Sequence, residues 1–186
     1  NEGEGIEACL KSVCDQTLPR DQYEVIVVDG NSKDNTREIA AKYADKVFIQ
    51  TSKKVGGARN DGVMEAKYDW IVTADADCFF PRTWLETIVN DFKNHPEAAT
   101  FYGPIYPLEP GLKHKIEVFL YNRVVWLGGK TGIFYATLGA NTAFRKKEFI
   151  EAGMYRVCDA GDDWELPKRM KHFGKVHLDM KMSVGF

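Results

Sequence analysis

The chain has 186 residues, of which 44% are hydrophobic and 12% aromatic, so it can bury a sizeable core and is expected to form one domain. Its formal net charge of −2 leaves no excess of Lys and Arg to neutralise phosphates, which argues against nucleic acid as a partner. The four cysteines lack the spacing and the neighbouring histidines of a zinc site, so reduced thiols are expected.

Helices and strands are predicted to alternate along the first part of the chain. Amphipathic periodicity identifies the helices, and apolar β-branched runs identify the strands. In order, the elements are a helix over residues 6–14, a strand over 23–28, a helix over 34–43, a strand over 46–50, a helix over 56–67 and a strand over 70–74. This alternation implies right-handed βαβ crossovers and a mostly parallel sheet covered on both faces, which is an α/β fold.

Two carboxylates, Asp75 and Asp77, follow the last of these strands with only Ala76 between them. Alternate residues of an extended chain point the same way, so both carboxylates can present oxygens to one space. Two like charges this close repel each other, and a divalent cation bound together with substrate phosphates would neutralise them. The alternative is a polar strand end that leads into a turn before Pro81, and it is favoured when the motif is considered alone.

Two further motifs accompany this pair. Asp29 ends the strand over 23–28 and begins a loop of small polar residues, and ligands of open α/β sheets bind at such carboxyl ends. The paired Gly56 and Gly57 allow a ligand to approach a helix start, where Arg59 could bond a base or phosphate through its planar guanidinium. The structural alternatives are an ordinary turn for the Asp29 loop and a surface side chain for Arg59.

In their order and spacing, these motifs resemble those of the family 2 nucleotide-sugar glycosyltransferases, which have the GT-A fold, and the resemblance covers nearly the whole chain. The matching segments are Asn1-Glu2, Cys9-Leu10-Lys11-Ser12, Gln16-Thr17, Val27 to Thr36, Ala58-Arg59-Asn60, Asp75-Ala76-Asp77, Gly139 to Arg145 and Gly161 to Leu166. The resemblance implies a single GT-A domain over residues 1–186, with a Rossmann-like, mostly parallel sheet flanked by helices. Residues 1–105 would form the nucleotide-sugar-binding half and residues 106–186 the acceptor-side half.

The chain also departs from the family pattern. The family's usual first strand has no counterpart in residues 1–186, and a larger parent chain with further C-terminal sequence is plausible. The Gln-x-x-Arg-Trp signature of processive polysaccharide synthases is not visible after Leu166, so a nonprocessive transferase is expected.

The resemblance implies an inverting, metal-dependent transfer of a sugar from a nucleotide-diphosphate sugar to a hydroxyl or phosphate acceptor. Asp163 matches the family's general base, which takes the proton of the attacking acceptor hydroxyl. Asp77 would hold Mg²⁺ or Mn²⁺ on the diphosphate, and Asp75 would contact ribose or the sugar. Asp29 would meet the base, and Arg59 the base or phosphate. Without the family pattern, Asp163 is more simply an acid that favours a helix N-terminus.

The sequence predicts the acceptor less sharply than the donor. Residues 112–127 combine basic side chains, a broad apolar face and Trp126, which is compatible with an anionic membrane surface, although packing against the core is favoured. Peripheral membrane contact would make a polyprenyl-phosphate or another lipid-linked sugar the acceptor, and a carbohydrate is the alternative. No apolar run is long enough to span a bilayer, so we expect a cytoplasmic protein, or one at the cytoplasmic face of a membrane.

Three other interpretations stay open. His177, in a late strand pattern, could complete a metal shell, although a structural histidine is favoured. A sugar-phosphate nucleotidyltransferase would also place metal-binding carboxylates on an α/β sheet. A noncatalytic sugar-nucleotide-binding module would keep the Asp29 pocket and have no need of Asp163, so a turnover assay separates it from the enzymes.

Overall fold

The structure is a computed structural model that describes residues 1–3, 5–108, 111–135, 137–158 and 161–186, without the side chain of Asp162. Its longer helices are α1 (Ile6–Cys14), α2 (Thr36–Ala40), α3 (Lys54–Glu65), α4 (Trp84–Asn94), α5 (Leu112–Thr131), α6 (Lys146–Glu151) and α7 (Asp162–Met170). Two 3-10 turns, η1 (Arg20–Gln22) and η2 (Gly139–Asn141), accompany them. The strands are β1 (Ile26–Asp29), β2 (Lys46–Ile49), β3 (Trp70–Thr73), β4 (Ala98–Tyr102), β5 (Ile105–Tyr106), β6 (Thr142–Arg145), β7 (Lys175–Leu178) and β8 (Val184–Gly185).

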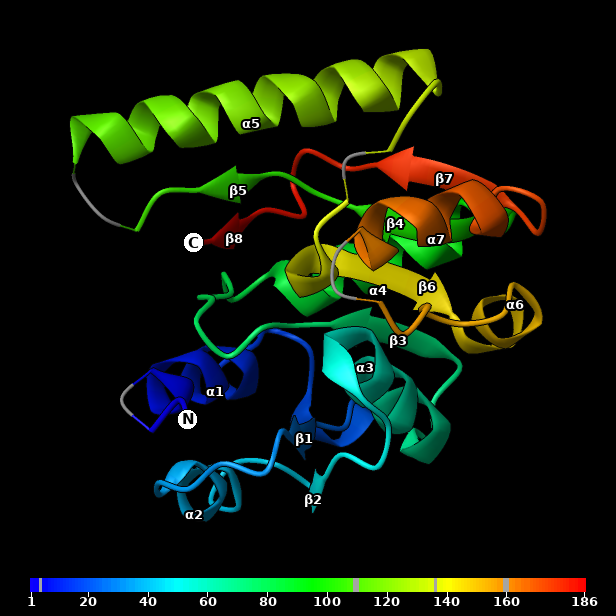
Figure 1. Ribbon diagram of the computed structural model, residues 1–186. Coiled ribbons are helices and arrows are strands. Elements are labelled where there is room, and N and C mark those ends of the chain that lie inside the picture. Colours follow the sequence, from blue (N-terminus) through cyan, green and yellow to red (C-terminus); the bar gives the residue numbers. More distant parts are fainter. Residues whose placement is uncertain (4, 109–110, 136, 159–160) are drawn as a thin grey trace.

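The helix and strand alternation predicted over residues 6–74 is confirmed by α1, β1, α2, β2, α3 and β3 (Figure 1). The bounds differ most, by three residues, at the start of β1, which is Ile26 rather than Tyr23, and at the end of α2, which is Ala40 rather than Tyr43. The backbone N–H of Val25 donates to the Asp45 side chain at 2.7 Å instead of to a neighbouring strand, and pairing with β2 starts one residue later. The Asp45 side chain therefore ends the β1–β2 hydrogen-bond ladder at Ile26, although the apolar sequence pattern extends back to Tyr23.

The central sheet has the strand order β3-β6-β4-β7. Strand β6 runs antiparallel to β3 and to β4, whereas β4 and β7 are parallel. Thr73 and Tyr102 both lie opposite Thr142, and Tyr102 also pairs with Leu178, so β3, β4 and β7 have their carboxyl ends at one edge. The α/β fold is confirmed, and β6 is the strand that reverses direction within this sheet.

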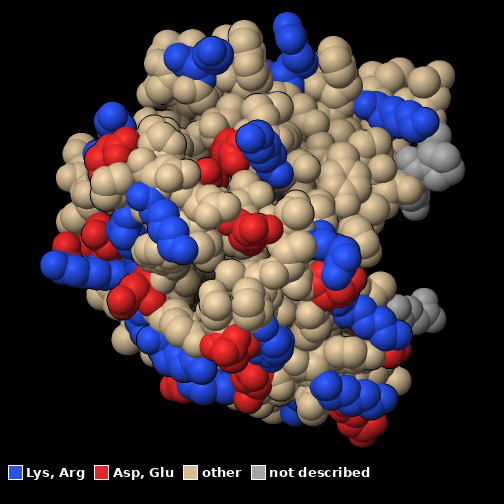
Figure 2. All heavy atoms as spheres, turned by 180° about the vertical axis from the view of Figure 1, so that it is seen from behind, with Lys and Arg blue, Asp and Glu red and all other residues tan. Residues whose placement is uncertain are grey.

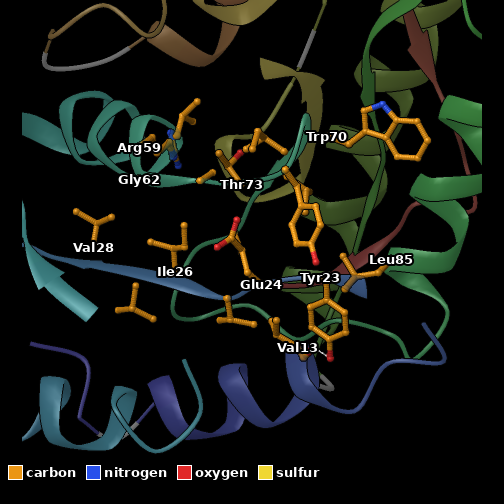
Figure 3. A pocket seen from close by; sticks show the side chains of 18 of the residues that line it. Val13, Tyr23, Glu24, Ile26, Val28, Arg59, Gly62, Trp70, Thr73 and Leu85 are labelled. Atoms are coloured by element: carbon orange, nitrogen blue, oxygen red, sulfur yellow. Dashed lines mark hydrogen bonds between the residues drawn. The ribbon is translucent and has the colours of Figure 1, made fainter. Parts of the chain in front are cut away.

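An apolar cavity of about 670 Å³ separates β1 from β3. The pair β1-β2 and the four-stranded sheet are distinct among the described residues, because β1 bonds only to β2 and β3 only to β6. Ile26 and Val28 of β1 line this cavity together with Thr73 of β3 and Gly62 of α3 (Figure 3). The continuous sheet implied by the alternation is therefore interrupted here.

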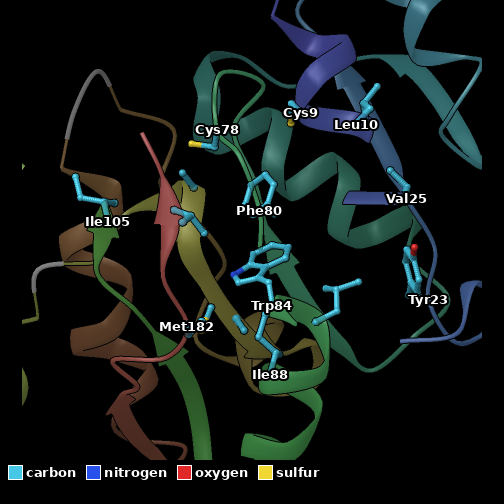
Figure 4. Close-up of a cluster of buried hydrophobic side chains, with 14 of the residues drawn as sticks. Cys9, Leu10, Tyr23, Val25, Cys78, Phe80, Trp84, Ile88, Ile105 and Met182 are labelled. Atoms are coloured by element: carbon cyan, nitrogen blue, oxygen red, sulfur yellow. The ribbon is translucent and has the colours of Figure 1, made fainter. Parts of the chain in front are cut away.

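The main hydrophobic core lies around Trp84 and joins α1 and α4 to the sheet (Figure 4). The Trp84 side chain is 2% exposed and packs on Phe80 with a ring separation of 4.2 Å. A second buried cluster, which includes Phe144, Phe149 and Leu166, fastens α6 and α7 to the other side of β6. This second cluster fixes the position of α7, at whose start Asp163 stands.

Helix α5 lies at the outside of the molecule (Figure 1). Its buried residues are Val118, Val125 and Gly128. The helix therefore packs against the core, as the sequence favours, along only one narrow side. Its outer side exposes many large apolar residues, namely Leu112, Ile116, Phe119, Leu120, Val124, Trp126 and Leu127. Among the described residues, none of the helices is both long and apolar enough to span a bilayer.

Candidate functional site

Arg59 joins two of the predicted site carboxylates. Its Nη2 lies 2.8 Å from Oδ1 of Asp75, which follows β3, and its Nη1 lies 2.9 Å from Oδ1 of Asp163, at the start of α7. Arg59 itself is on α3, so its guanidinium joins the end of the next strand, 16 residues on, to a helix start that lies 104 residues on. The predicted roles of these three residues therefore fall within a single cluster.

The Arg59 side chain is only 11% exposed. Because water screens buried charges less, its attraction to the two carboxylates is stronger than at the surface. Burial alone lowers the pKa of the guanidinium, but Asp75, Tyr155 and Asp163 outweigh it, so the net shift of the Arg59 pKa is upward. The guanidinium therefore stays charged and balances two carboxylates that would otherwise repel each other.

The surroundings of Arg59 include residues that the sequence alone did not assign to the site. A Cβ on Gly139 would lie 2.0 Å from Cζ of Arg59, so the guanidinium packs directly against the glycine backbone. The Arg59 guanidinium also lies 5.5 Å from the ring centre of Tyr155. Asn60 holds that tyrosine by two bonds to its backbone, of 2.8 and 3.0 Å. The Thr137 hydroxyl donates to the backbone carbonyl of Asp163.

The sequence offers different amounts of information about these additional residues. Gly139 belongs to the Gly-x-Asn segment that carried the family resemblance, so its importance could be inferred but its partner could not. Tyr155 has no motif around it, and its contact with α3 spans about half of the chain. Only the folded arrangement brings that ring under the guanidinium.

Asp77 is exposed and lies two residues beyond Asp75. Its side chain contacts the Cys78 thiol, with the sulfur 3.7 Å from Oδ1, a weak interaction. The Asp75 side chain is 40% exposed and uses Oδ1 for Arg59. Carboxylate oxygens are the ligands that Mg²⁺ and Mn²⁺ prefer, so the donor set fits such a cation.

Two cysteines lie behind this carboxylate pair. Burial, followed by the charges of Asp77 and Asp75, raises the pKa of Cys9 to about 12 and that of Cys78 to about 12. Both thiols therefore stay protonated at neutral pH.

Asp29 occupies a separate, smaller cavity of about 230 Å³ at the carboxyl end of β1. Its side chain is 2% exposed, and its Oδ2 accepts a 2.8 Å bond from the backbone N–H of Ser32. Asn31, with a φ of 67°, turns the loop around this carboxylate. Ala76 lines this cavity as well as the larger one, so the Asp29 pocket adjoins the Asp75/Asp77 pair.

His177 lies away from this group. It is on β7, at the other edge of the four-stranded sheet from β3, beside His95 and Glu97. Three strand spacings, about 14 Å, separate those edges. The structure thus brings Arg59, Asp75 and Asp163 together, places Asp77 and Asp29 next to them, and does not bring His177 to the pair.

Comparisons with known proteins identify the family of the chain. The family model described as Glycosyl transferase family 2 matches residues 1–138. The chain is 38% identical over 92 residues to Glycosyltransferase AglE of Haloferax volcanii, an alignment that covers 46% of the chain and 30% of that protein. It is 25% identical over 183 residues to Poly-beta-1,6-N-acetyl-D-glucosamine synthase of Staphylococcus aureus, covering 91% of the chain and 44% of the synthase.

Solved structures share the fold. The mannosyltransferase PcManGT from Pyrobaculum calidifontis, solved with GDP-Man and Mn²⁺, superposes with a TM-score of 0.77 at 19% identity, over 100% of this chain and 54% of that one. TarS 1-349 of S. aureus, solved with UDP-GlcNAc, gives 0.75 at 17% identity, over 100% and 55%. The chain thus spans about a third to a half of these proteins. On the family match and the GT-A fold, the chain belongs to glycosyl transferase family 2.

Proposed function

We propose that this protein transfers a sugar from a nucleotide-diphosphate sugar to an acceptor hydroxyl or phosphate, with inversion at the anomeric carbon and with Mg²⁺ or Mn²⁺ present. The observation that carries the proposal is the Arg59 bridge, at 2.8 Å to Asp75 and 2.9 Å to Asp163. Asp75, proposed for the donor sugar, and Asp163, proposed as the general base, thus contact the same Arg59 guanidinium. A donor that contacts Asp75 would then lie within reach of the base.

Each residue of the cluster has a chemical task in this proposal. Asp163 accepts the proton of the acceptor hydroxyl while the hydroxyl oxygen attacks the anomeric carbon and the bond to the diphosphate breaks. Asp29 binds the nucleotide base in the 230 Å³ cavity, and Asp75 binds ribose or the sugar. Arg59 is bonded to Asp163, and a donor phosphate that draws Arg59 toward itself would release this carboxylate for proton transfer.

The divalent cation would be held by Asp77. A bound cation supplies charge neutralisation for the diphosphate leaving group. The exposure of Asp77 and its single weak contact with Cys78 leave its carboxylate accessible to such a cation and to the donor. PcManGT was solved with GDP-Man and Mn²⁺, which supports the same pairing of donor and cation here.

The test is a panel of UDP-, GDP- and dTDP-sugars with Mn²⁺ or Mg²⁺, first by thermal shift and then by transfer. We expect one nucleotide to raise the melting temperature in a manner that chelation abolishes. Asp163→Asn keeps the side-chain size and should retain this shift while losing turnover by at least about 100-fold, the lower end of general-base contributions. Asp77→Ala should lose the cation-dependent shift as well as turnover.

The exposed carboxylate of Asp21, on η1, provides a matched control, and Asp21→Asn should leave shift and turnover unchanged. Full turnover in Asp163→Asn would eliminate that residue as the base. A donor shift without turnover in the unsubstituted protein would instead support a noncatalytic binding module. The family match favours sugar transfer over nucleotidyl transfer.

We further propose that α5 rests on an anionic lipid surface and that the acceptor is lipid-linked. Leu112, Phe119 and Leu120 are 75, 62 and 58% exposed on one side of the helix. Four basic residues, Lys113, Lys115, Arg123 and Lys130, accompany a single acid, Glu117. In Figure 2 the upper edge of the molecule, where α5 lies in Figure 1, carries blue side chains among tan ones. Exposed apolar area combined with basic charge is the pattern of helices that bind the membrane interface.

Trp126 supports the same orientation. Arg123 and Lys130 lie 5.4 and 5.8 Å from its ring centre, so an amphipathic ring and two cations share one position on the helix. Rings of this kind sit at the headgroup level of bilayers, where cations also meet lipid phosphates.

Flotation with vesicles tests this contact. The protein should float with phosphatidylglycerol vesicles and not with pure phosphatidylcholine, and Leu112→Ser combined with Phe119→Ser should abolish flotation. Met64→Ser combined with Val157→Ser removes apolar residues that are 56 and 54% exposed elsewhere, and it should have no effect. Flotation that depends on neither lipid charge nor the α5 residues would contradict the lipid assignment, and self-association abolished by the α5 pair would assign this face to a second copy instead.

A further inference from the structure

A second group of metal-ligating side chains lies at the β7 edge of the sheet. His95 follows the last residue of α4, Glu97 immediately precedes β4, and His177 is the third residue of β7. Two chain segments, the short connection between α4 and β4 and the strand β7, thus bring two imidazoles and one carboxylate to the same place. The donor and acceptor chemistry proposed above does not use any of these residues.

The spacing of the ligand atoms matches that of a bound transition metal. Nδ1 of His95 lies 3.6 Å from Oε1 of Glu97, and Nε2 of His177 lies 3.5 Å from the same oxygen. All three ligand atoms lie within 4.8 Å of one another. In a tetrahedral Zn²⁺ site, bonds of about 2.0–2.2 Å place neighbouring ligand atoms about 3.4 Å apart, so the two measured pairs already have this spacing.

His177 offers an independent sign that a ligand is expected here. Its Nε2 is buried and makes no hydrogen bond, although Glu97 is 3.5 Å away. The ring is fixed by stacking on Phe101, with centroids 5.5 Å apart and planes inclined by 19°. A buried nitrogen that makes no hydrogen bond is costly even with a carboxylate 3.5 Å away, and a metal ion at this nitrogen would satisfy it.

The ligand set differs in kind from the Asp75/Asp77 pair. Two imidazoles with one carboxylate suit Zn²⁺, whereas a pair of carboxylates suits Mg²⁺ or Mn²⁺. The two groups also lie on strands at opposite edges of the four-stranded sheet. A Zn²⁺ ion here would be a second metal that takes no part in the proposed transfer.

We propose that His95, Glu97 and His177 bind one Zn²⁺, with water in the fourth position, and that the ion fastens the end of α4 and the start of β4 to the edge strand β7. The rings of His95 and His177 lie side by side at a centroid separation of 4.9 Å. Lys175 lies 3.7 Å from Oε1 of Glu97 and gives up this ion pair when the metal binds. The half-exposed positions of His95 and Glu97 provide the entry path.

Calorimetric titration of the chelator-treated protein with ZnCl₂ at pH 7.5 tests the site. One ion should bind per chain, and Glu97→Gln and His177→Ala should each weaken binding at least tenfold. His172→Ala removes an exposed histidine outside the cluster and should bind Zn²⁺ like the unsubstituted protein, as should Asp77→Ala. Zn²⁺ binding that survives both Glu97→Gln and His177→Ala, that is lost in Asp77→Ala, or that does not occur would overturn the proposal.

Two further readouts separate metal binding from a merely structural role of these side chains. Co²⁺ in place of Zn²⁺ should give the visible absorption of a tetrahedral nitrogen and oxygen site, and Glu97→Gln should remove it. Zn²⁺ should raise the melting temperature of the unsubstituted protein and of His172→Ala, because an ion that binds only the folded state stabilises it. An equal rise in Glu97→Gln, a substitution at an exposed position that tolerates a neutral side chain, would contradict the assignment.

Discussion

At the scale of single residues, Arg59 connects the two halves of the chain. Its guanidinium bonds Asp75 in the first half and Asp163 in the second, and it rests on Gly139. The sequence predicts Arg59, Asp75 and Asp163 because each lies in a short motif that resembles a landmark of the family. It could not predict that Arg59 bonds both carboxylates, since those contacts span 16 and 104 residues and depend on where α7 packs.

Gly139→Ala should therefore impair the site more than the fold. The new Cβ would lie 2.0 Å from the Arg59 guanidinium, a flexible side-chain end that can withdraw, so Asp75 and Asp163 would lose their shared partner. We expect kcat/KM to fall by about tenfold or more, equivalent to about 1.4 kcal/mol of transition-state stabilisation, with only a small change in melting temperature.

The control for this prediction is Gly111→Ala, because a Cβ on Gly111 would meet no atom within 4 Å. That variant should match the unsubstituted protein in a sugar-transfer assay. Unchanged kcat/KM in Gly139→Ala would mean that the close packing of Arg59 on the glycine is not needed for activity.

At the scale of elements, Asn141 shows why a motif residue need not touch a ligand. Its side chain is fully buried and donates to the backbone carbonyls of Pro104 and Met182, at 3.2 and 2.6 Å. Its Oδ1 accepts the indole N–H of Trp84 at 3.0 Å. The Gly-x-Asn segment resembles a family landmark near the acceptor side, yet here the asparagine joins η2 to α4 and to the chain segments that follow β4 and precede β8.

Asn141→Ala should destabilise the protein by about 3 kcal/mol, because it leaves a buried indole N–H and two buried carbonyls without their partner. Chemical denaturation of the variant and the unsubstituted protein measures this difference. Asn94→Ala, at an exposed position near the end of α4, is the matched control and should change stability by less than about 0.5 kcal/mol. An equal loss in both variants would indicate that helix α4 itself, rather than the Asn141 network, limits stability.

Elements with strong local patterns could be predicted closely, and the differences arise where tertiary contacts intervene. The predicted bounds of α1 match the observed ones because the spacing of its apolar residues fits only one helix. For α5 the sequence could not decide between core and surface, since both require an apolar face. Only the folded chain shows that α5 contacts the core along a narrow side, at Val118, Val125 and Gly128.

At the scale of the whole molecule, the cavity between β1 and β3 is the main feature that the sequence did not predict. Apolar runs indicate strands but not which strands are neighbours, so a continuous sheet followed from the alternation alone. Within the part of the chain that the structure describes, β1 and β3 each have one edge without a strand partner, and both strands line the same apolar space of about 670 Å³. Edges of this kind can accept a further strand. That the family's usual first strand lies outside residues 1–186 stays a prediction.

The position of Asn1 defines how such a strand would enter. Asn1 and Ala76 line the small cavity at the carboxyl end of β1, and Ala76 also lines the large one. A strand whose last residue is joined to Asn1 would therefore lie in the large cavity and run parallel to β1. It would pair with β1 on one side and with β3 on the other, and it would close the two sheets into one.

An engineered extension tests this geometry. A designed segment of eight residues, rich in Val, Ile and Thr and joined to Asn1, should raise the melting temperature by at least about 3 °C, equivalent to about 1 kcal/mol for a chain of this size. Hydrogen exchange at the backbone amides of β1 and β3 should slow as their edges become paired. An extension of equal length made of Gly and Ser cannot fill the apolar space and should change neither quantity. Equal effects of the two extensions, or slower exchange confined to α1, would show that the designed segment lies elsewhere and that the cavity does not accept a strand.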